Sequence, residues 1–204
     1  MNFYERKILP KVIHCVCGLK PMMRQRSKVV PQAEGVVLEL GIGSGLNLPY
    51  YDSSQVKHLI GVDPTPNHKA LKKAIELSSL STEMIFESAE VLPMADNSMD
   101  SIVCTYTLCT IPDIDQTLDQ CQRVLKPGGQ FIFVEHGIAP DEKVQRTQNR
   151  INPLWKKLAG GCNLNRDIPH ALEEHGFSVA KLESMYLPGW KPACWNVWGN
   201  AQAK

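Results

Sequence analysis

The sequence lacks the features of a disulfide-stabilised, zinc-clipped or membrane-spanning chain. Its seven cysteines form no CxxC unit, and seven thiols cannot all pair within one monomer, which argues against a disulfide framework and a structural zinc site. No window holds the uncharged apolar run of about 18 residues that a spanning helix needs. The N-terminal residues show no signal-peptide pattern either. We therefore expect a reducing, cytoplasmic setting, with peripheral membrane contact as an alternative.

The whole chain also has almost no excess of positive or negative charge, which limits the classes of protein to which it can belong. The 204 residues have a formal net charge of +1, with 43% hydrophobic and 21% charged residues, which is typical of a globular chain forming one domain over residues 1–204. No patch combines arginines with aromatic residues, so no nucleic-acid partner is expected. Residues 1–30, however, contain seven lysines and arginines against one glutamate. This basic lead predicts a helical lid over a ligand pocket, or contact with an anionic membrane surface.

From residue 36 onward, short apolar runs alternate with amphipathic segments. We predict that Thr65 is the N-cap of a helix over 66–80, with Pro66 in its first turn. The last predicted helix, over 168–175, has Asp167 as its N-cap and ends before Gly176. The alternation predicts a doubly wound, mostly parallel α/β sheet over residues 36–204, because right-handed crossovers leave few other topologies. The predicted strands cover 36–40, 58–62, 84–86, 101–104, 131–134, 177–182 and 195–201, and the predicted helices cover 66–80, 114–125, 144–158 and 168–175.

A glycine-rich loop follows the first predicted strand, where ligands of such sheets bind. Residues 41–45 have the spacing G-x-G-x-G, which lets the backbone turn sharply and a ligand approach closely. A dinucleotide loop has G-x-G-x-x-G, and here Leu46 stands at the position of the last glycine. Asp63 ends the second strand, where its carboxylate can accept hydrogen bonds from both hydroxyls of a ribose. These features predict a nucleoside cofactor and leave an NAD-dependent oxidoreductase open.

Three segments in order, residues 37–45, 89–100 and 123–129, resemble the class I S-adenosylmethionine (SAM) dependent methyltransferases. The resemblance spans nearly the whole chain and implies a Rossmann-like fold with a seven-stranded sheet, SAM as methyl donor and S-adenosylhomocysteine as product. The chain departs from the family at Ser88, where an acidic residue often contacts the adenine. The cofactor residues that the resemblance implies are Glu39 for the amino-acid end of SAM, Gly41, Gly43 and Gly45 beneath it, Asp63 for the ribose, Ser88, Ala89 and Glu90 for the adenine, and Thr105.

A closer resemblance, to the thiol S-methyltransferase branch, is carried by residues 104–109, residues 135–136, residues 160–164 and the C-terminal tryptophans. It favours a small, fairly apolar thiol as methyl acceptor. His136, directly after the fifth strand, can take a proton or steady a thiolate. Thr105 and Tyr106 follow the fourth strand and can line the reacting methyl group. These three are the predicted catalytic residues, and no metal is expected because the sulfonium already activates the methyl group.

Several alternatives remain open from the sequence. The acceptor can instead be a phospholipid amine or a quinone-type carbon, and a non-catalytic SAM-binding module has the same cofactor motifs. We interpret Cys109 and Cys162 as small buried apolar residues rather than nucleophiles. Trp195 and Trp198 are expected in the core, whereas Trp190 lies in a turn-rich stretch and is a candidate pocket or lid residue. The oligomeric state is not predicted.

Overall fold

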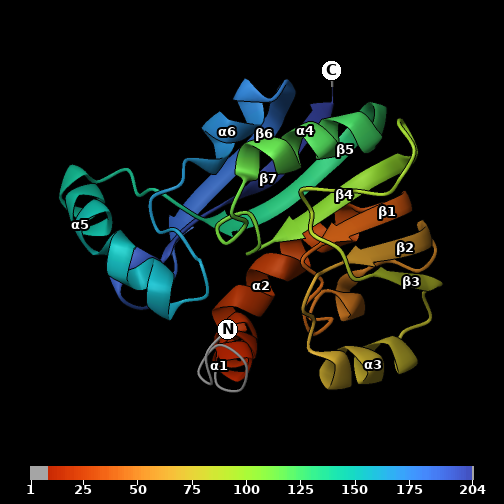
Figure 1. Cartoon of the computed structure of the whole chain (residues 1–204), viewed down its shortest axis with the longest axis horizontal. Helices are drawn as coiled ribbons and strands as arrows, with labels where there is room; N and C mark the ends of the chain where they lie inside the picture. Colours follow the sequence, from red (N-terminus) through yellow and green to blue (C-terminus); the bar gives the residue numbers. More distant parts are fainter. Residues whose placement is uncertain (1–8, 204) are drawn as a thin grey trace.

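The computed structural model describes residues 9–203, and within them seven strands form one sheet with helices on both faces (Figure 1). The sheet order is β3-β2-β1-β4-β5-β7-β6, with β7 antiparallel to both neighbours and the other pairs parallel. The expected mostly parallel, seven-stranded α/β fold is confirmed. The strands are β1 (Gly35–Leu40), β2 (Val56–Val62), β3 (Thr82–Ile85), β4 (Met99–Thr105), β5 (Leu125–His136), β6 (Phe177–Tyr186) and β7 (Trp195–Ala203).

The helices are α1 (Leu9–Cys17), α2 (Lys20–Val29), α3 (His68–Glu76), α4 (Ile114–Val124), α5 (Glu142–Leu158) and α6 (Ile168–Glu174). Four helices cover the sheet, α2 and α3 on one face and α4 and α6 on the other, whereas α1 contacts α2 and α5 contacts Lys191–Ala193. Strand β1 sends Leu38 into the core shared with α4 and α6, and Val37 into the core shared with α2 and α3. Both side chains are fully buried, as expected for a parallel strand covered on both faces.

The start of α3 differs from its predicted position. Asn67 is the N-cap, and its side chain accepts a hydrogen bond from the backbone N–H of Ala70. Thr65 is not the cap, because its own N–H donates to Asp63 Oδ1 at 2.8 Å and the chain turns there before the helix begins. The third strand, predicted over 84–86, begins two residues earlier and ends one residue earlier than expected, since β3 covers Thr82–Ile85 and Phe86 is exposed. The Asp167 cap of α6 is confirmed.

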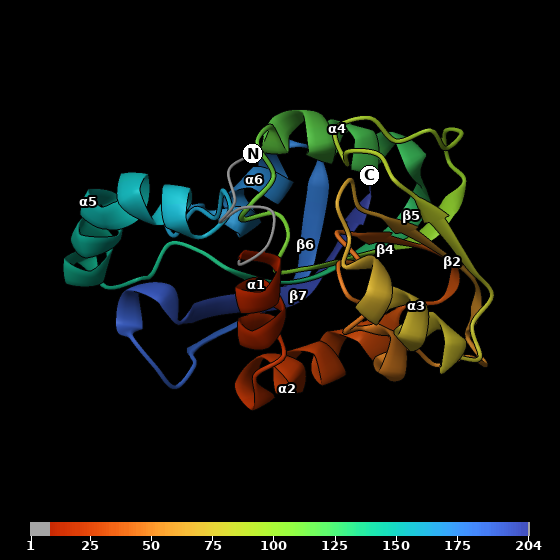
Figure 2. The ribbon, with the colours of Figure 1, turned by 60° about the horizontal axis from the view of Figure 1, so that its bottom comes forward.

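Two helices form the lead segment, as the basic lead predicted. Helix α2 packs against β5 and β7 of the sheet, and α1 is joined to the end of α2 that points away from the sheet core (Figures 1 and 2). The lead is joined to the core by Val29 and Val30, which are both fully buried. Arg6 and Lys7 of the basic lead lie outside the described residues. Over residues 9–203, none of the helices combines the length and the apolar character needed to cross a bilayer.

Candidate active site

The glycine loop turns sharply at the carboxyl end of β1. Gly41, Gly43 and Gly45 all have positive φ, a region that side chains rarely adopt. A Cβ on Gly41 would meet the Thr107 hydroxyl at 2.4 Å, and one on Gly45 would meet Ala74 at 2.9 Å, so these two glycines permit close packing. A Cβ on Gly43 would meet only the Gly41 carbonyl at 3.7 Å. The space above Gly43 is therefore open to a ligand.

Asp63 lies across from this loop at the end of β2. Its Oδ2 accepts a hydrogen bond from the Gly43 N–H at 2.9 Å, and its Oδ1 accepts one from the Thr65 N–H. The carboxylate thus ties the glycine loop to the loop after β2. Each carboxylate oxygen has a further lone pair, so Asp63 can still accept from a ribose at the edge of the loop.

Glu39, the next predicted cofactor residue, is buried in a polar network. Its Oε2 accepts from the Tyr51 hydroxyl at 2.7 Å, and its Oε1 accepts from Asn47 Nδ2 at 3.0 Å. Burial raises the pKa of Glu39 to about 7, although both of these hydrogen bonds act to lower it. A carboxylate with a raised pKa is matched to a cationic partner, since an ammonium group would restore its charged form.

The network continues through Asn47 to β4 and to the lead. Asn47 Nδ2 also donates to Thr105 Oγ1 at 2.9 Å, and Arg26 of α2 donates to Asn47 Oδ1 at 2.8 Å and to Thr105 Oγ1. The structure therefore brings Thr105 and Glu39, both of them predicted cofactor residues, into one hydrogen-bonded set. Arg26 is buried, and its Nε has no hydrogen-bond partner among the described residues.

The predicted adenine segment lies directly after β3. Ala89 is buried, and Glu90 accepts hydrogen bonds from the Ser88 hydroxyl and, at 3.0 Å, from the Asp113 N–H that precedes α4. The Glu90 carboxylate is therefore committed to holding the start of α4. Exposed apolar side chains, Phe86 and Val91, lie on either side of this segment in the sequence.

Tyr106, the first residue after β4, has an unusual backbone conformation. Its φ is +55°, in the left-handed region that costs energy for a residue with a side chain. The phenol donates to Asn196 Oδ1 at 2.8 Å, and the Arg26 guanidinium lies 5.2 Å from the ring centre. Tyr106 therefore faces the lead helix with its hydroxyl already engaged, which suits a wall of the pocket better than a proton carrier.

The loop after β4 is held by the last residues of β5. Glu135 is fully buried, and its carboxylate accepts from the N–H groups of Thr107, Leu108 and Cys109 at 2.7–3.3 Å. Burial raises the pKa of Glu135, against the hydrogen bonds that lower it. Glu135 thus fixes the loop that carries Tyr106 and Cys109, and it places the next residue, His136, at the same edge of the sheet.

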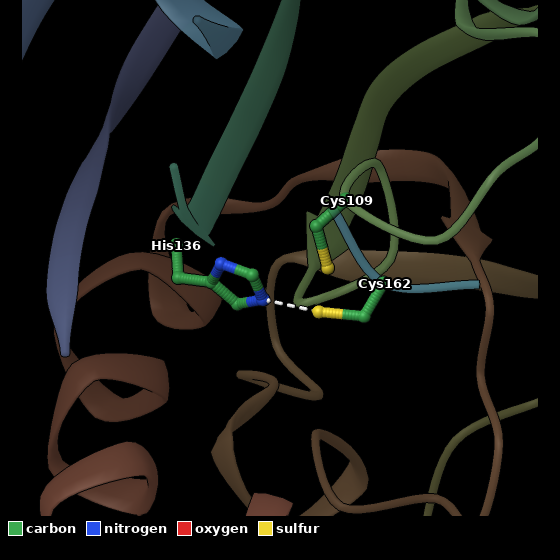
Figure 3. Close-up of side chains that lie close together, drawn as sticks. All are labelled: Cys109, His136 and Cys162. Carbon is green, nitrogen blue, oxygen red and sulfur yellow. Dashed lines mark hydrogen bonds between the residues drawn. The ribbon is translucent and has the colours of Figure 1, made fainter. Parts of the chain in front are cut away.

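His136 meets two cysteines from separate loops (Figure 3). Its Nε2 lies 2.8 Å from Cys162 Sγ, and the reactive atoms of Cys109, His136 and Cys162 all lie within 4.8 Å of one another. Trp155 Nε1 also donates to Cys162 Sγ at 3.2 Å. Both cysteines are buried, as predicted, but their sulfurs have polar partners and are not simply apolar filling.

The charges of this cluster follow from its hydrogen bonds. The hydrogen bond from the Cys109 thiol, together with His136, outweighs burial and lowers the pKa of Cys162 to about 4. The same hydrogen bond and burial hold the pKa of Cys109 well above its usual value. Burial lowers the pKa of His136, but Cys162 and Glu135 together outweigh it and the pKa is raised. These opposite shifts in pKa favour transfer of a proton from Cys162 to His136.

The lead and the C-terminal aromatic residues enclose this edge. His14 Nδ1 of α1 lies 2.7 Å from the Ser44 hydroxyl in the glycine loop, so α1 reaches the cofactor side. Trp190 is half exposed, with its ring 6.0 Å from that of Trp155, which places it on the acceptor side as a pocket candidate. Trp198 is buried in the core, as expected, and Trp195 packs at the core margin.

Comparison with known proteins identifies the family. Residues 38–133 match the methyltransferase domain family. The chain is 35% identical over 174 residues to thiol S-methyltransferase TMT1B of Rattus norvegicus, covering 82% of this chain and 70% of that protein. It is 33% identical over 177 residues to thiol S-methyltransferase TMT1A of Homo sapiens, covering 84% and 72%. The chain belongs to the SAM-dependent methyltransferases. A SAM-dependent methyltransferase from Methanosarcina mazei shares the fold, with a TM-score of 0.65 at 22% identity over 90% of this chain and 97% of that one.

The site of this methyltransferase includes residues that sequence reasoning missed. Arg26, Asn47 and Tyr51 surround Glu39 and Thr105, and none of them stands in a recognisable motif. The involvement of Cys109 and Cys162 with His136 was missed as well, although residues 104–109 and 160–164 had been singled out for their resemblance. The only sequence signal for Asn47 is its position in the turn after the glycine loop.

Proposed function

We propose that this methyltransferase transfers the methyl group of SAM to a small, fairly apolar thiol. The observation that carries the proposal is the His136 and Cys162 pair next to the loop after β4, since an imidazole whose pKa is raised favours a thiolate nucleophile at the acceptor edge. The thiol S-methyltransferase relatives support the same acceptor class. The relation to them is 33–35% identity, so the acceptor is our inference.

The cofactor side fits SAM in three respects. Gly43 leaves open space above the loop, Asp63 offers carboxylate oxygens for a ribose, and the buried Glu39 has a pKa suited to an ammonium partner. The unpartnered Nε of buried Arg26 adds a positive group for the cofactor carboxylate. When bound, SAM supplies a methyl group on a sulfonium, and the role of the chain is to align a nucleophile with that carbon and exclude water.

The reaction needs an ionised acceptor sulfur near Thr105 and Tyr106. The acceptor thiol loses its proton to solvent, its sulfur forms the new bond to the methyl carbon, and the electron pair of the breaking bond returns to the sulfonium sulfur. His136 lies at the edge of the sheet where it can stabilise the acceptor thiolate. A phospholipid amine or a quinone-type carbon would instead need a free base to remove a proton, and Glu135 is already occupied by three backbone amides. This favours the thiol.

We also propose that the lead closes the acceptor side and can lie on a membrane surface. Val12 and Val16, one turn apart on α1, and Leu19, the residue before α2, are each about half exposed, and basic residues precede and follow them. An exposed apolar stripe with flanking positive charge suits an anionic lipid surface that holds apolar acceptors. Vesicles containing an anionic lipid should bind the protein, and binding equal to that of neutral vesicles would contradict this role.

The decisive experiment compares acceptors with SAM present. Methyl transfer to simple alkyl thiols should occur, with kcat/KM rising toward the acceptor pKa of about 8.5. His136→Gln should lower kcat about tenfold and leave SAM affinity unchanged, whereas His170→Gln, at an exposed position on α6, serves as control. Transfer to ethanolamine lipids with no transfer to any thiol would overturn the acceptor class. Unchanged kinetics in His136→Gln would assign that residue a structural role.

A further inference from the structure

The cluster at the end of β5 has the composition of a metal site. Cys109 comes from the loop after β4, His136 from the last position of β5, and Cys162 from the loop after α5 (Figure 3). Their donor atoms lie within 4.8 Å of one another. Donors that share a tetrahedral zinc ion lie about 3.5 to 3.8 Å apart, given bonds of about 2.3 Å to sulfur and 2.0 Å to nitrogen. The distances between the three donor atoms are therefore close to those of ligands that share one zinc ion.

The backbone around the cluster keeps these donors together. The Asn163 N–H and Asn163 Nδ2 both donate to the Cys109 carbonyl, at 2.8 and 3.0 Å, so the two cysteine loops are joined directly. Gly160 and Gly161 precede Cys162 with φ of +64° and +91°, which lets this loop turn tightly back toward β4. The site therefore does not depend on long, mobile side chains.

The partners of Cys162 are those of a ligand thiolate. The indole N–H of Trp155 points at its sulfur, the usual way in which a neighbouring donor orients a metal-bound sulfur. His136 Nε2 lies closer to Cys162 than two ligands of one ion would, at 2.8 Å, so the imidazole must withdraw by about 0.7 Å to admit zinc. His136 Nδ1 is buried without a partner among the described residues. The ring therefore has no hydrogen bond on that side to oppose this movement.

We propose that Cys109, His136 and Cys162 bind one zinc ion through two thiolate sulfurs and the neutral imidazole Nε2, and that the protons displaced from these groups pass to solvent. In this state the zinc ion, rather than the ring of His136, supplies the positive charge beside the acceptor sulfur. Three protein ligands leave one tetrahedral position open, as in catalytic rather than structural zinc sites. We further infer that the acceptor thiol occupies this position, a step that rests on the proposed thiol methyltransferase function. The acceptor releases its proton to solvent as its sulfur binds zinc, and this sulfur then takes the methyl group. The ion keeps its charge throughout, and the thioether product leaves because it is a weaker ligand.

The two cysteines also have an alternative chemistry that the same test resolves. A Cys109–Cys162 disulfide would require a two-electron oxidant and would remove both sulfur donors. We prefer the metal because the cluster includes an imidazole, which a disulfide does not need. The chain has further cysteines outside the cluster, and Cys194 is partly exposed, so it provides a matched thiol control.

The test measures metal in the full chain without SAM or acceptor. Reduced, metal-free protein is incubated with Zn²⁺ alone, dialysed and analysed for metal per chain. Wild type and Cys194→Ser should each retain one ion, and Cys109→Ser and Cys162→Ser should bind zinc at least about 100-fold more weakly. His136→Gln gives a second reading if a cysteine variant fails to fold. Loss of retention in wild type, equal retention in all variants, or a Cys109–Cys162 disulfide that persists under reduction would each overturn the site.

A second measurement separates the open position from the proposed function. Co²⁺ in the same site should show the visible absorption of a tetrahedral ion with sulfur ligands. Adding a simple alkyl thiol without SAM should shift this absorption, and an unchanged spectrum would overturn acceptor binding at the metal. Methyl transfer is assayed independently, so a chain that binds zinc but methylates no thiol would refute the function and keep the site. A chain that methylates thiols equally well without metal would keep the proposed function and overturn acceptor binding at the metal.

Discussion

The cofactor side and the acceptor side of this methyltransferase are built in different ways. The loops proposed to bind the cofactor are local, with Gly41, Gly43 and Gly45 after β1 and Asp63 after β2, whose carboxylate accepts from the Gly43 and Thr65 N–H groups. Arg26 and Thr105 join this side from distant segments. The proposed acceptor side joins side chains from distant segments, since Cys109 and His136 are 27 residues apart in sequence, and His136 and Cys162 are 26 apart. A cofactor shared by a whole family favours the first arrangement. An acceptor that varies favours the second, because single loops can change independently.

The largest effect should come from the cofactor side. Asp63→Ala removes the acceptor for two ribose hydroxyls, and hydrogen bonds to charged groups are worth about 1.5 to 3 kcal/mol each. We expect SAM affinity measured by calorimetry to fall about 100-fold or more. Asp52→Ala is the matched control, because Asp52 also bonds a backbone N–H two residues ahead but lies away from the loop. Affinity within twofold of wild type would refute the ribose contact.

Substitutions at Gly43 and Gly128 can distinguish the effect of backbone strain from that of a steric clash with the cofactor. Both have positive φ, and a Cβ on either meets nothing closer than 3.7 Å within the protein. Gly43→Val should weaken SAM binding about tenfold or more, because its side chain enters the ligand space, whereas Gly128→Val should cost similar stability but leave the affinity unchanged. Calorimetry and thermal unfolding measure the two effects. Equal affinities in both variants would place the cofactor elsewhere.

The lead helix links the two sides and gives the next effect. Removing residues 1–17 deletes α1 with its His14 contact to Ser44, yet keeps Val29 and Val30 in the core. We expect kcat/KM for a working thiol to fall about tenfold with little change in Tm, as for loss of a lid. A cut at Gln32 would instead remove core residues and confound the result. Unchanged kcat and KM in the shorter deletion would exclude a lid role for α1.

The features that could be predicted from the sequence also differ between the two sides. Strand runs such as residues 36–40 and the glycine loop were readable because their signals are local. The α3 cap at Asn67 was missed because Thr65 is equally suited by type, and only the Asp63 turn decides between them. The roles of Arg26 and of the Cys162 cluster could not be predicted, because they arise from contacts between residues at least 21 positions apart in the sequence. Single residues without a motif carry no sequence signal for such contacts.

The pH dependence of SAM binding tests the buried carboxylate. The pKa of Glu39 is raised to about 7 in the folded chain without cofactor, and only the ionised form attracts the SAM ammonium. Below pH 7 the protonated form dominates, so SAM affinity should fall about tenfold for each pH unit below that value. Glu39→Gln should bind SAM weakly and without this dependence. The same pH slope in wild type and Glu39→Gln would assign the titration to another group.

The smallest effect should come from Trp190, which tests whether the acceptor wall is as replaceable as its construction suggests. Its ring is 53% exposed and contacts Trp155, which holds Cys162. An aromatic pair is worth about 0.5 to 1.5 kcal/mol, so Trp190→Ala should raise KM for an apolar thiol about two- to tenfold. SAM affinity and kcat should not change, because Trp190 touches neither the cofactor loop nor His136. The increase should grow with the length of the alkyl chain if the ring covers the acceptor. An equal increase for all thiols would show that Trp190 only supports Trp155, and no increase would remove it from the pocket.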